Sequence, residues 1–161
     1  MKVLVVSDTH RRHENFVKVI DELEKDIDYV IHCGDVEGEE DYLESLLKCP
    51  IVFVQGNNDF FTFNPAYRVV KYEYVNVFVT HGHRGGVAYD PFRLVDMARD
   101  DDCQIAVFGH THRPYYEVKN GIHILNPGSI SYPRQGGGIP TYAIINITGP
   151  NEFNIELKEV R

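Results

Sequence analysis

The stretch Lys2–His10, KVLVVSDTH, joins a run of aliphatic residues to a polar loop, and this change recurs along the chain. The next segment predicts a helix over 15–23, because its apolar residues are spaced three and four apart at Phe16, Val19, Ile20 and Leu23. The pattern repeats with a strand over 29–33, a helix over 42–47 and a strand over 51–54. Strands that alternate with helices in this way indicate a parallel sheet buried on both faces.

The second half of the chain has a different pattern. Branched and aromatic residues over 69–72 and 75–80, around a turn near Glu73, predict an antiparallel pair of strands. Asp90 and Pro91 predict an N-cap and a first turn for a helix over 92–98. A buried strand over 105–108 precedes a hairpin over 115–125, which turns at Asn120-Gly121, and strands over 141–147 and 153–160 end the chain.

These elements predict an α/β fold in which two packed mixed β-sheets are flanked by helices. About ten short strands are many for one sheet of a domain this small. We expect residues 1–161 to form a single domain, mostly parallel in its N-terminal half and mostly antiparallel in its C-terminal half.

Composition limits the classes of function. With 43% hydrophobic and 25% charged residues, the chain is typical of a soluble globular protein. No apolar run approaches the roughly 20 residues that cross a bilayer, and the start MKVLVVSD lacks a signal-peptide pattern, so we expect no membrane contact and a cytoplasmic location. A net charge of −8 argues against stable nucleic-acid binding but is compatible with a small phosphate substrate. Composition leaves a homo-oligomer open.

Metal-capable side chains follow five of the predicted strands. The carboxyl ends of strands in such sheets meet at one rim, so we expect these side chains to share a small volume. Taken alone, Asp8-x-His10 and Gly34-Asp35 are better explained by chance and by an ordinary turn, and the pair His110 and His112 does not by itself make a metal site. Together they offer oxygen and imidazole ligands without thiolate, a mixture typical of Mn, Fe, Ni or Zn sites. They are Asp8 and His10, Asp35, Asn57 and Asn58, His81 and His83, and His110 and His112.

Five ordered motifs resemble those of the calcineurin-like metallophosphoesterase superfamily. They are Asp8-x-His10, Gly34-Asp35, Gly56-Asn57-x-Asp59, His81-Gly82-His83 and Gly109-His110-x-His112. The segments Asn126-Pro127-Gly128-Ser129 and Pro133-Arg134 resemble its small bacterial and archaeal phosphodiesterase branch. The resemblance spans residues 2 to about 147, almost the whole chain.

The resemblance implies a dinuclear metal centre. Asp8, His10 and His112 would hold one divalent ion, Asn57, His81 and His110 the other, and Asp35 would bridge them. Manganese is the expected metal, with nickel, iron or zinc as alternatives. A metal-bound hydroxide would then attack the phosphorus of a small phosphodiester in line.

Asn58 departs from the family pattern, because many members carry a histidine there that protonates the leaving group. An amide donates a hydrogen bond to phosphate but has no titratable proton near neutral pH. We therefore expect Asn58 to contact the substrate, and His83, with His13 as second choice, to be the candidate acid, although both are equally compatible with structural roles. Arg11 and Arg84 are candidate phosphate contacts or ordinary surface arginines.

A non-catalytic function is the main alternative. The superfamily fold is similar to that of the retromer subunit, which binds protein partners and has lost some metal-site residues. All seven expected ligand positions here carry competent ligands, which favours a phosphodiesterase over a weakly active or inactive scaffold.

Overall fold

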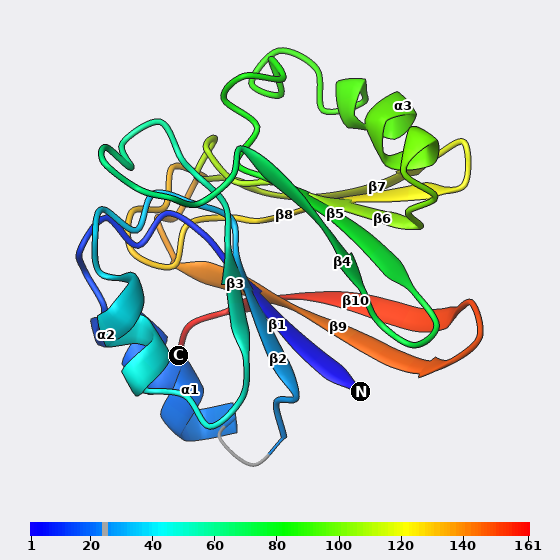
Figure 1. The fold of residues 1–161 in the computed structure, drawn as a ribbon. Coiled ribbons are helices and arrows are strands. Elements are labelled where there is room, and N and C mark those ends of the chain that lie inside the picture. Colours follow the sequence, from blue (N-terminus) through cyan, green and yellow to red (C-terminus); the bar gives the residue numbers. More distant parts are fainter. Residues whose placement is uncertain (24–25) are drawn as a thin grey trace.

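The segment that opens the sequence forms β1 (Lys2–Val6), the central strand of a five-stranded sheet. We describe the protein from a computed structural model, over residues 1–23 and 26–161. The strand order is β10-β9-β1-β2-β3 (Figure 1), with β2 (Tyr29–His32) parallel to β1 and to β3 (Ile51–Phe53). On its other side β1 pairs antiparallel with β9 (Thr141–Gly149), which pairs antiparallel with β10 (Glu152–Glu159).

The second sheet also has five strands, in the order β4-β5-β6-β8-β7. These are β4 (Tyr67–Lys71), β5 (Asn76–Thr80), β6 (Ile105–Val107), β7 (Pro114–Lys119) and β8 (Ile122–Pro127). Both edge strands are antiparallel to their neighbours, but β5, β6 and β8 are parallel to one another. The expectation of a mostly antiparallel C-terminal half was therefore wrong for the centre of this sheet, because α3 and the β7 edge strand lie on the crossovers between its parallel strands.

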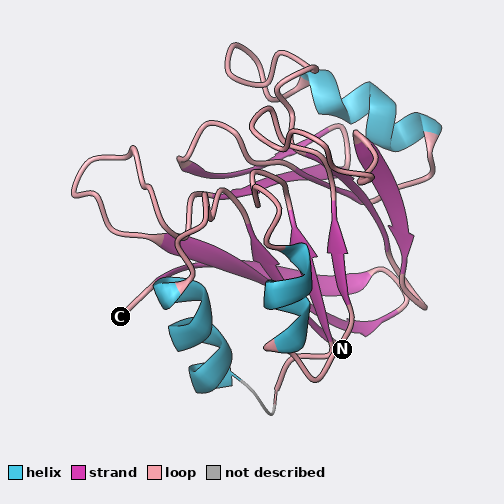
Figure 2. Cartoon of the chain, turned by 60° about the vertical axis from the view of Figure 1, so that its left-hand side comes forward, coloured by secondary structure: helices cyan, strands magenta, loops and turns pink. Residues whose placement is uncertain are grey.

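In the part of the chain that the structure describes, three helices cover the outer faces of the two packed sheets. Helices α1 (Glu14–Leu23) and α2 (Glu40–Ser45) lie against the first sheet, and α3 (Arg93–Asp100) lies against the second (Figures 1 and 2). Among the described residues, no helix has the length and apolar character needed to cross a bilayer.

The sheet faces explain why the opening run is apolar throughout. Val3 and Val5 point into the core between the sheets, and Leu4 and Val6 point into the core beneath α1 and α2. All four side chains are fully buried, as expected for a central strand covered on both faces. The strand ends at Val6, and Ser7 to His10 form the start of the loop at its carboxyl end.

Two helix predictions differ from the structure at their ends. The helix predicted over 42–47 begins two residues earlier, as α2. Asp90 is not the N-cap of α3, because the preceding residues form a tighter turn in which Arg93 and Leu94 donate to carbonyls three residues back. Asp90 instead accepts a hydrogen bond from the Phe92 N–H, at 3.0 Å, and so caps that turn.

Candidate metal centre

Four of the predicted ligands lie close enough to contact one ion. Asp8 and His10 follow β1, Asp35 follows β2 and His112 follows β6, and one donor atom from each lies within 4.8 Å of the others. The His112 Nε2 atom lies 3.2 Å from His10 Nε2 and 3.3 Å from Asp8 Oδ1. His10 Nε2 is also 3.5 Å from Asp35 Oδ2.

A second group of predicted ligands lies on the other side of Asp35. The Oδ1 atom of Asn57 is 3.0 Å from His81 Nε2 and 2.9 Å from His110 Nδ1. His81 Nε2 is 3.4 Å from Asp35 Oδ2, the same oxygen that faces His10. One carboxylate oxygen therefore borders both groups, as a bridging ligand must.

Hydrogen bonds fix the imidazole rings with their free nitrogens facing inward. The Nδ1 atoms of His81 and His112 lie 2.6 and 2.7 Å from the carbonyl oxygens of Cys33 and Tyr132, and must therefore donate. His10 Nδ1 likewise donates to the Glu37 carboxylate, at 2.6 Å. In a neutral ring the Nε2 atom is then an unprotonated acceptor that is able to bind a cation. Burial lowers the pKa of His81, but the hydrogen bond to Asp35 and the charges of Asp8 and Asp35 outweigh it and raise the pKa, so without a cation this ring takes up a proton more readily than a free histidine.

This arrangement fits a cation. The lone pairs of two Nε2 atoms face each other across 3.2 Å, and both face carboxylate oxygens. Among the described residues, the buried Asp8 Oδ1 has no hydrogen-bond partner. Acceptors that converge without a donor are costly to bury, and a divalent ion would satisfy them all. The metal ligand set implied by the family resemblance is therefore chemically consistent with the structure.

Hydrogen bonds and nearby charges hold the two carboxylates in their ionised form despite their burial. Burial raises the pKa of Asp35, but the hydrogen bond and charge of His81, together with two donors from Asn58, outweigh it and keep the pKa well below its ordinary value. The pKa of Asp8 is also lowered, because His112 and His81 outweigh complete burial. Burial and the His81 charge lower the pKa of His110, so its ring is neutral and able to bind a metal.

The ligand loops have an unusual backbone. Non-glycine residues rarely take positive φ angles, and clusters of them mark functional sites. Five predicted ligands do so, with φ between 46° and 69°: Asp8, His10, Asp35, His110 and His112. Space is equally restricted, because a Cβ at Gly56 would overlap the Asp35 carboxylate, and one at Gly109 would overlap the Ser7 hydroxyl. These loops are therefore shaped to bring side chains from both sheets together.

Asp59 has a structural role that no sequence pattern predicted. Its buried carboxylate accepts four backbone N–H groups at 2.7–2.8 Å, from Asp35, Val36, Glu37 and Gly56. It thereby joins the loop after β2 to the loop after β3. Asp59 belongs to the pattern Gly56-Asn57-x-Asp59, which indicated the family resemblance but not this hydrogen-bonding role.

His32 and Ser129 support the ligand loops from within. His32 Nδ1 accepts the Gly34 N–H at 3.2 Å, so its Nε2 donates to the Thr9 hydroxyl at 3.1 Å. Ser129 Oγ donates to the Asp8 carbonyl at 2.8 Å. Complete burial lowers the pKa of His32 to about 4, so this ring is neutral in the folded protein. No sequence pattern distinguished His32 from an ordinary core residue.

The candidate catalytic residues lie beside the cluster. Asn58 donates to both Asp35 oxygens, from its backbone N–H at 2.8 Å and from Nδ2 at 2.9 Å. The His83 ring centroid lies 5.3 Å from that of His81 and 6.2 Å from that of His110. Burial and then the charge of His81 lower the pKa of His83, so little of its imidazolium form is present at neutral pH to act as an acid. Contact of either residue with substrate stays a prediction.

The two arginines predicted to contact phosphate each donate to a neighbouring side chain, and their contact with substrate stays a prediction. Arg11 donates to Glu39 at 3.2 Å, and Arg84 donates to Gln55 at 3.3 Å. His13 borders a different cavity, next to Arg11 and Glu39. Arg134, which belongs to the segment Pro133-Arg134 of the family resemblance, lines two cavities whose walls also include predicted metal ligands.

Known proteins share this fold and are similar to this chain in sequence. Residues 1–149 match the model of the calcineurin-like phosphoesterase superfamily domain. A phosphodiesterase of Methanocaldococcus jannaschii is 28% identical, over 91% of this chain and 93% of that protein. A predicted phosphoesterase from Streptococcus pneumoniae has a crystal structure that is 30% identical, with a TM-score of 0.84, covering 98% of this chain and 88% of that one. The structure of vacuolar protein sorting 29 from Cryptosporidium parvum is 25% identical, with a TM-score of 0.78, covering 98% and 96%. The chain therefore belongs to the calcineurin-like phosphoesterase superfamily.

Proposed function

We propose that the protein is a phosphodiesterase that uses two divalent metal ions, manganese foremost, to hydrolyse a small phosphodiester. The observation that carries this proposal is the position of Asp35 Oδ2, 3.5 Å from His10 Nε2 and 3.4 Å from His81 Nε2, between two groups of ligands. When bound, two ions in such a site lower the pKa of a shared water molecule and neutralise charge on the phosphoryl oxygens.

The residues of the chain would divide the remaining tasks. Asp8, His10 and His112 would hold one ion, and Asn57, His81 and His110 the other, with Asp35 between them. The neutral amide of Asn57 would complete a ligand sphere without adding negative charge that repels the phosphate.

Asn58 and His83 would contact the substrate without acting as strong acids. The Asn58 amide has no titratable proton, and the lowered pKa of His83 leaves it neutral. Each can donate one hydrogen bond to a phosphoryl oxygen. We therefore propose that the enzyme acts on esters whose leaving groups depart with little help from a proton.

A protein-binding scaffold is the second candidate, supported by the similarity to vacuolar protein sorting 29. Its ligand positions would then serve structure rather than turnover. The completeness of the ligand set favours catalysis, because all seven expected positions carry competent ligands and the buried Asp8 Oδ1 has no hydrogen-bond partner among the described residues.

Hydrolysis of bis(p-nitrophenyl) phosphate with Mn²⁺ or Ni²⁺ separates these candidates. The enzyme should exceed free metal ions, and Asp35→Asn or His110→Ala should lower the rate by more than about 100-fold, because each removes a ligand. His123→Ala is the matched control, since this histidine lies on β8 and contacts Tyr116 on β7 and Phe153 on β10 instead. If the metal-loaded protein hydrolyses neither this diester nor p-nitrophenyl phosphate faster than the ions alone, the scaffold function replaces the proposal.

A further inference from the structure

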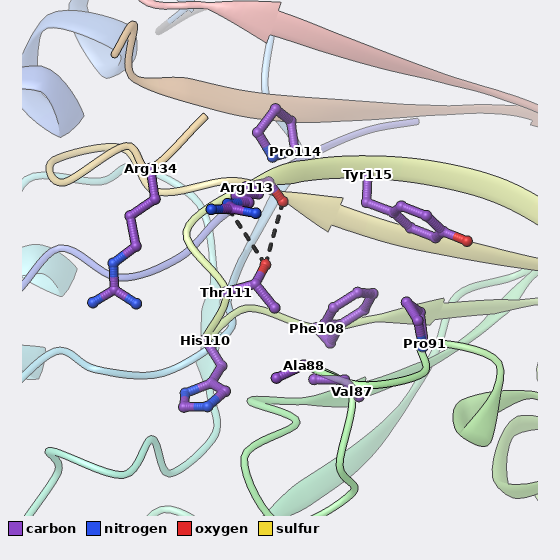
Figure 3. Close-up of a pocket in the computed structure, with 10 residues that line it drawn as sticks. All are labelled: Val87, Ala88, Pro91, Phe108, His110, Thr111, Arg113, Pro114, Tyr115 and Arg134. Carbon is purple, nitrogen blue, oxygen red and sulfur yellow. Dashed lines mark hydrogen bonds between the residues drawn. The ribbon is translucent and has the colours of Figure 1, made fainter. Parts of the chain in front are cut away.

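A cavity of about 480 Å³ opens directly beside the metal centre (Figure 3). Its volume lies in the range of small-molecule sites. His110, a predicted metal ligand, forms part of its wall, so the cavity borders the second group of predicted ligands. The segment between β5 and α3, the end of β6 and the start of β7 supply the rest of the lining: Val87, Ala88, Pro91, Phe108, Thr111, Arg113, Pro114 and Tyr115, with Arg134 from the loop before β9.

The cavity is polar at one end and apolar at the other. In Figure 3, His110 and Arg134 lie at one end, and Pro91 and Tyr115 lie at the opposite end, beyond Phe108. The Tyr115 hydroxyl donates to Glu117 at 2.6 Å, so the ring itself contributes to the cavity wall. The Tyr115 ring is partly exposed and packs against the almost fully buried Phe108 ring, with centroids 6.3 Å apart and planes tilted by 58°, so it offers supported aromatic surface to another flat ring.

Arg134 links this cavity to a second one. The second cavity, of about 650 Å³, is lined by His10, Glu37, His112, Ser131, Tyr132, Pro133 and Arg134. It therefore borders the first group of ligands, and its wall carries a carboxylate and hydroxyl groups. Among the described residues, the Arg134 guanidinium has no ion-pair partner, so its paired donors are available to an anion between the two cavities.

We infer that the phosphodiester carries two unlike arms and that the cavity beside His110 binds an aromatic one. This inference rests on the proposed function and specifies its substrate class. A phosphate held at the metal centre and by Arg134 would direct one ester substituent over Phe108 and Tyr115, where a flat apolar group gains most from burial. The other substituent would enter the polar cavity beside His10.

Binding of product-like monoesters tests the inference without requiring turnover. Calorimetry of the Mn²⁺-loaded protein should show that phenyl phosphate binds about tenfold more tightly than methyl phosphate, because the ring enters the cavity. Ala88→Phe fills the cavity from an exposed wall position and should reduce this ratio to near one. Val118→Phe is the matched control: it adds the same ring on β7, at a side chain that is 48% exposed and outside the cavity lining, and it should keep the tenfold ratio.

Arg134→Gln gives a separate readout, because it removes donors from the phosphate rather than from the arm. Both monoesters should bind more weakly by a similar factor, about tenfold, with their ratio retained. Arg99→Gln, which affects an exposed Asp96 pair on α3, should change neither affinity. Equal affinities of the two monoesters for the wild type, or an unchanged ratio in Ala88→Phe, would overturn the inference.

The outcomes also separate the two proposals. A protein that hydrolyses bis(p-nitrophenyl) phosphate but shows no phenyl preference would retain the proposed function and refute the aromatic arm. A protein without hydrolytic activity that prefers phenyl phosphate, and loses this preference in Ala88→Phe, would have the aromatic site without the proposed function.

Discussion

Replacement of Asp59 by asparagine should destabilise the protein strongly while changing its shape very little. Each Asp59 carboxylate oxygen accepts two backbone N–H groups, Oδ1 from Val36 and Glu37, and Oδ2 from Asp35 and Gly56. An amide keeps one acceptor oxygen and places an NH₂ group against the other two donors. Two hydrogen bonds to a charged acceptor are lost, at about 1.5–3 kcal/mol each, so the free energy of unfolding should fall by roughly 3–6 kcal/mol.

Guanidinium chloride unfolding, monitored by circular dichroism, measures this loss. Asp21→Asn on α1 is the matched control, because its exposed side chain makes the same chemical change at a surface position. A typical domain has about 5–15 kcal/mol of stability, so the Asp59 variant should unfold at a clearly lower denaturant concentration. Mn²⁺ affinity should fall as well, because Asp59 positions the backbone of Asp35.

Two results would refute the reasoning. A loss below about 1 kcal/mol would mean that the four N–H groups find other acceptors when Asp59 changes. Unchanged Mn²⁺ affinity in a destabilised variant would mean that Asp59 stabilises the fold without organising the metal centre.

Three further predictions concern pH, metal and leaving group. Burial lowers the pKa of His32 from 6.5 to about 4, so the unfolded chain takes up this proton first, and the free energy of unfolding should fall by up to about 3 kcal/mol as the pH drops from 6.5 to 4. Denaturation of the wild type and of His32→Asn at pH 7 and 4.5 should show a smaller pH effect in the variant. An equal pH effect in the two proteins would contradict the assignment. Mn²⁺ at 100 times its dissociation constant should stabilise the native protein by about 2.7 kcal/mol, as measured by thermal unfolding and reversed by EDTA, whereas Asp35→Asn should lose most of this gain. Rates for aryl phosphodiesters should fall steeply as the pKa of the leaving group rises, because Asn58 provides no acid; a flat dependence with chemistry limiting the rate would show that another residue supplies the proton.

Local patterns predicted the elements that carry the site. The apolar run of β1 and the helical spacing of α1 are properties of neighbouring residues, and the structure confirms both, with α1 starting one residue early at Glu14. The rule that strand ends share one rim correctly placed Asp8, His10 and Asp35 beside His112. These predictions needed only the chain direction and the positions where apolar runs stop.

Long-range pairing was harder to predict. The antiparallel alignment of β9 with β1 joins segments about 140 residues apart, as in the Lys2 and Asn146 pair, and no local pattern encodes it. The role of Asp59 depends on N–H groups from another loop, so its residue type alone resembled a turn former. Arg134 could not be selected over Arg11 or Arg84, because exposed arginines differ only in what surrounds them in space.

The segment between His81 and α3 lines the proposed aromatic site yet supplies no metal ligand beyond His81 itself. Val87, Ala88 and Pro91 all come from this stretch, whereas the predicted ligands come from the turns that follow β1, β2, β3, β5 and β6. On the proposed function, substitutions in 85–92 should therefore alter which alcohol is accepted while the predicted ligands stay unchanged. Such a separation would let proteins that evolve from this chain acquire new substrates through changes in one surface loop, without inactive intermediates.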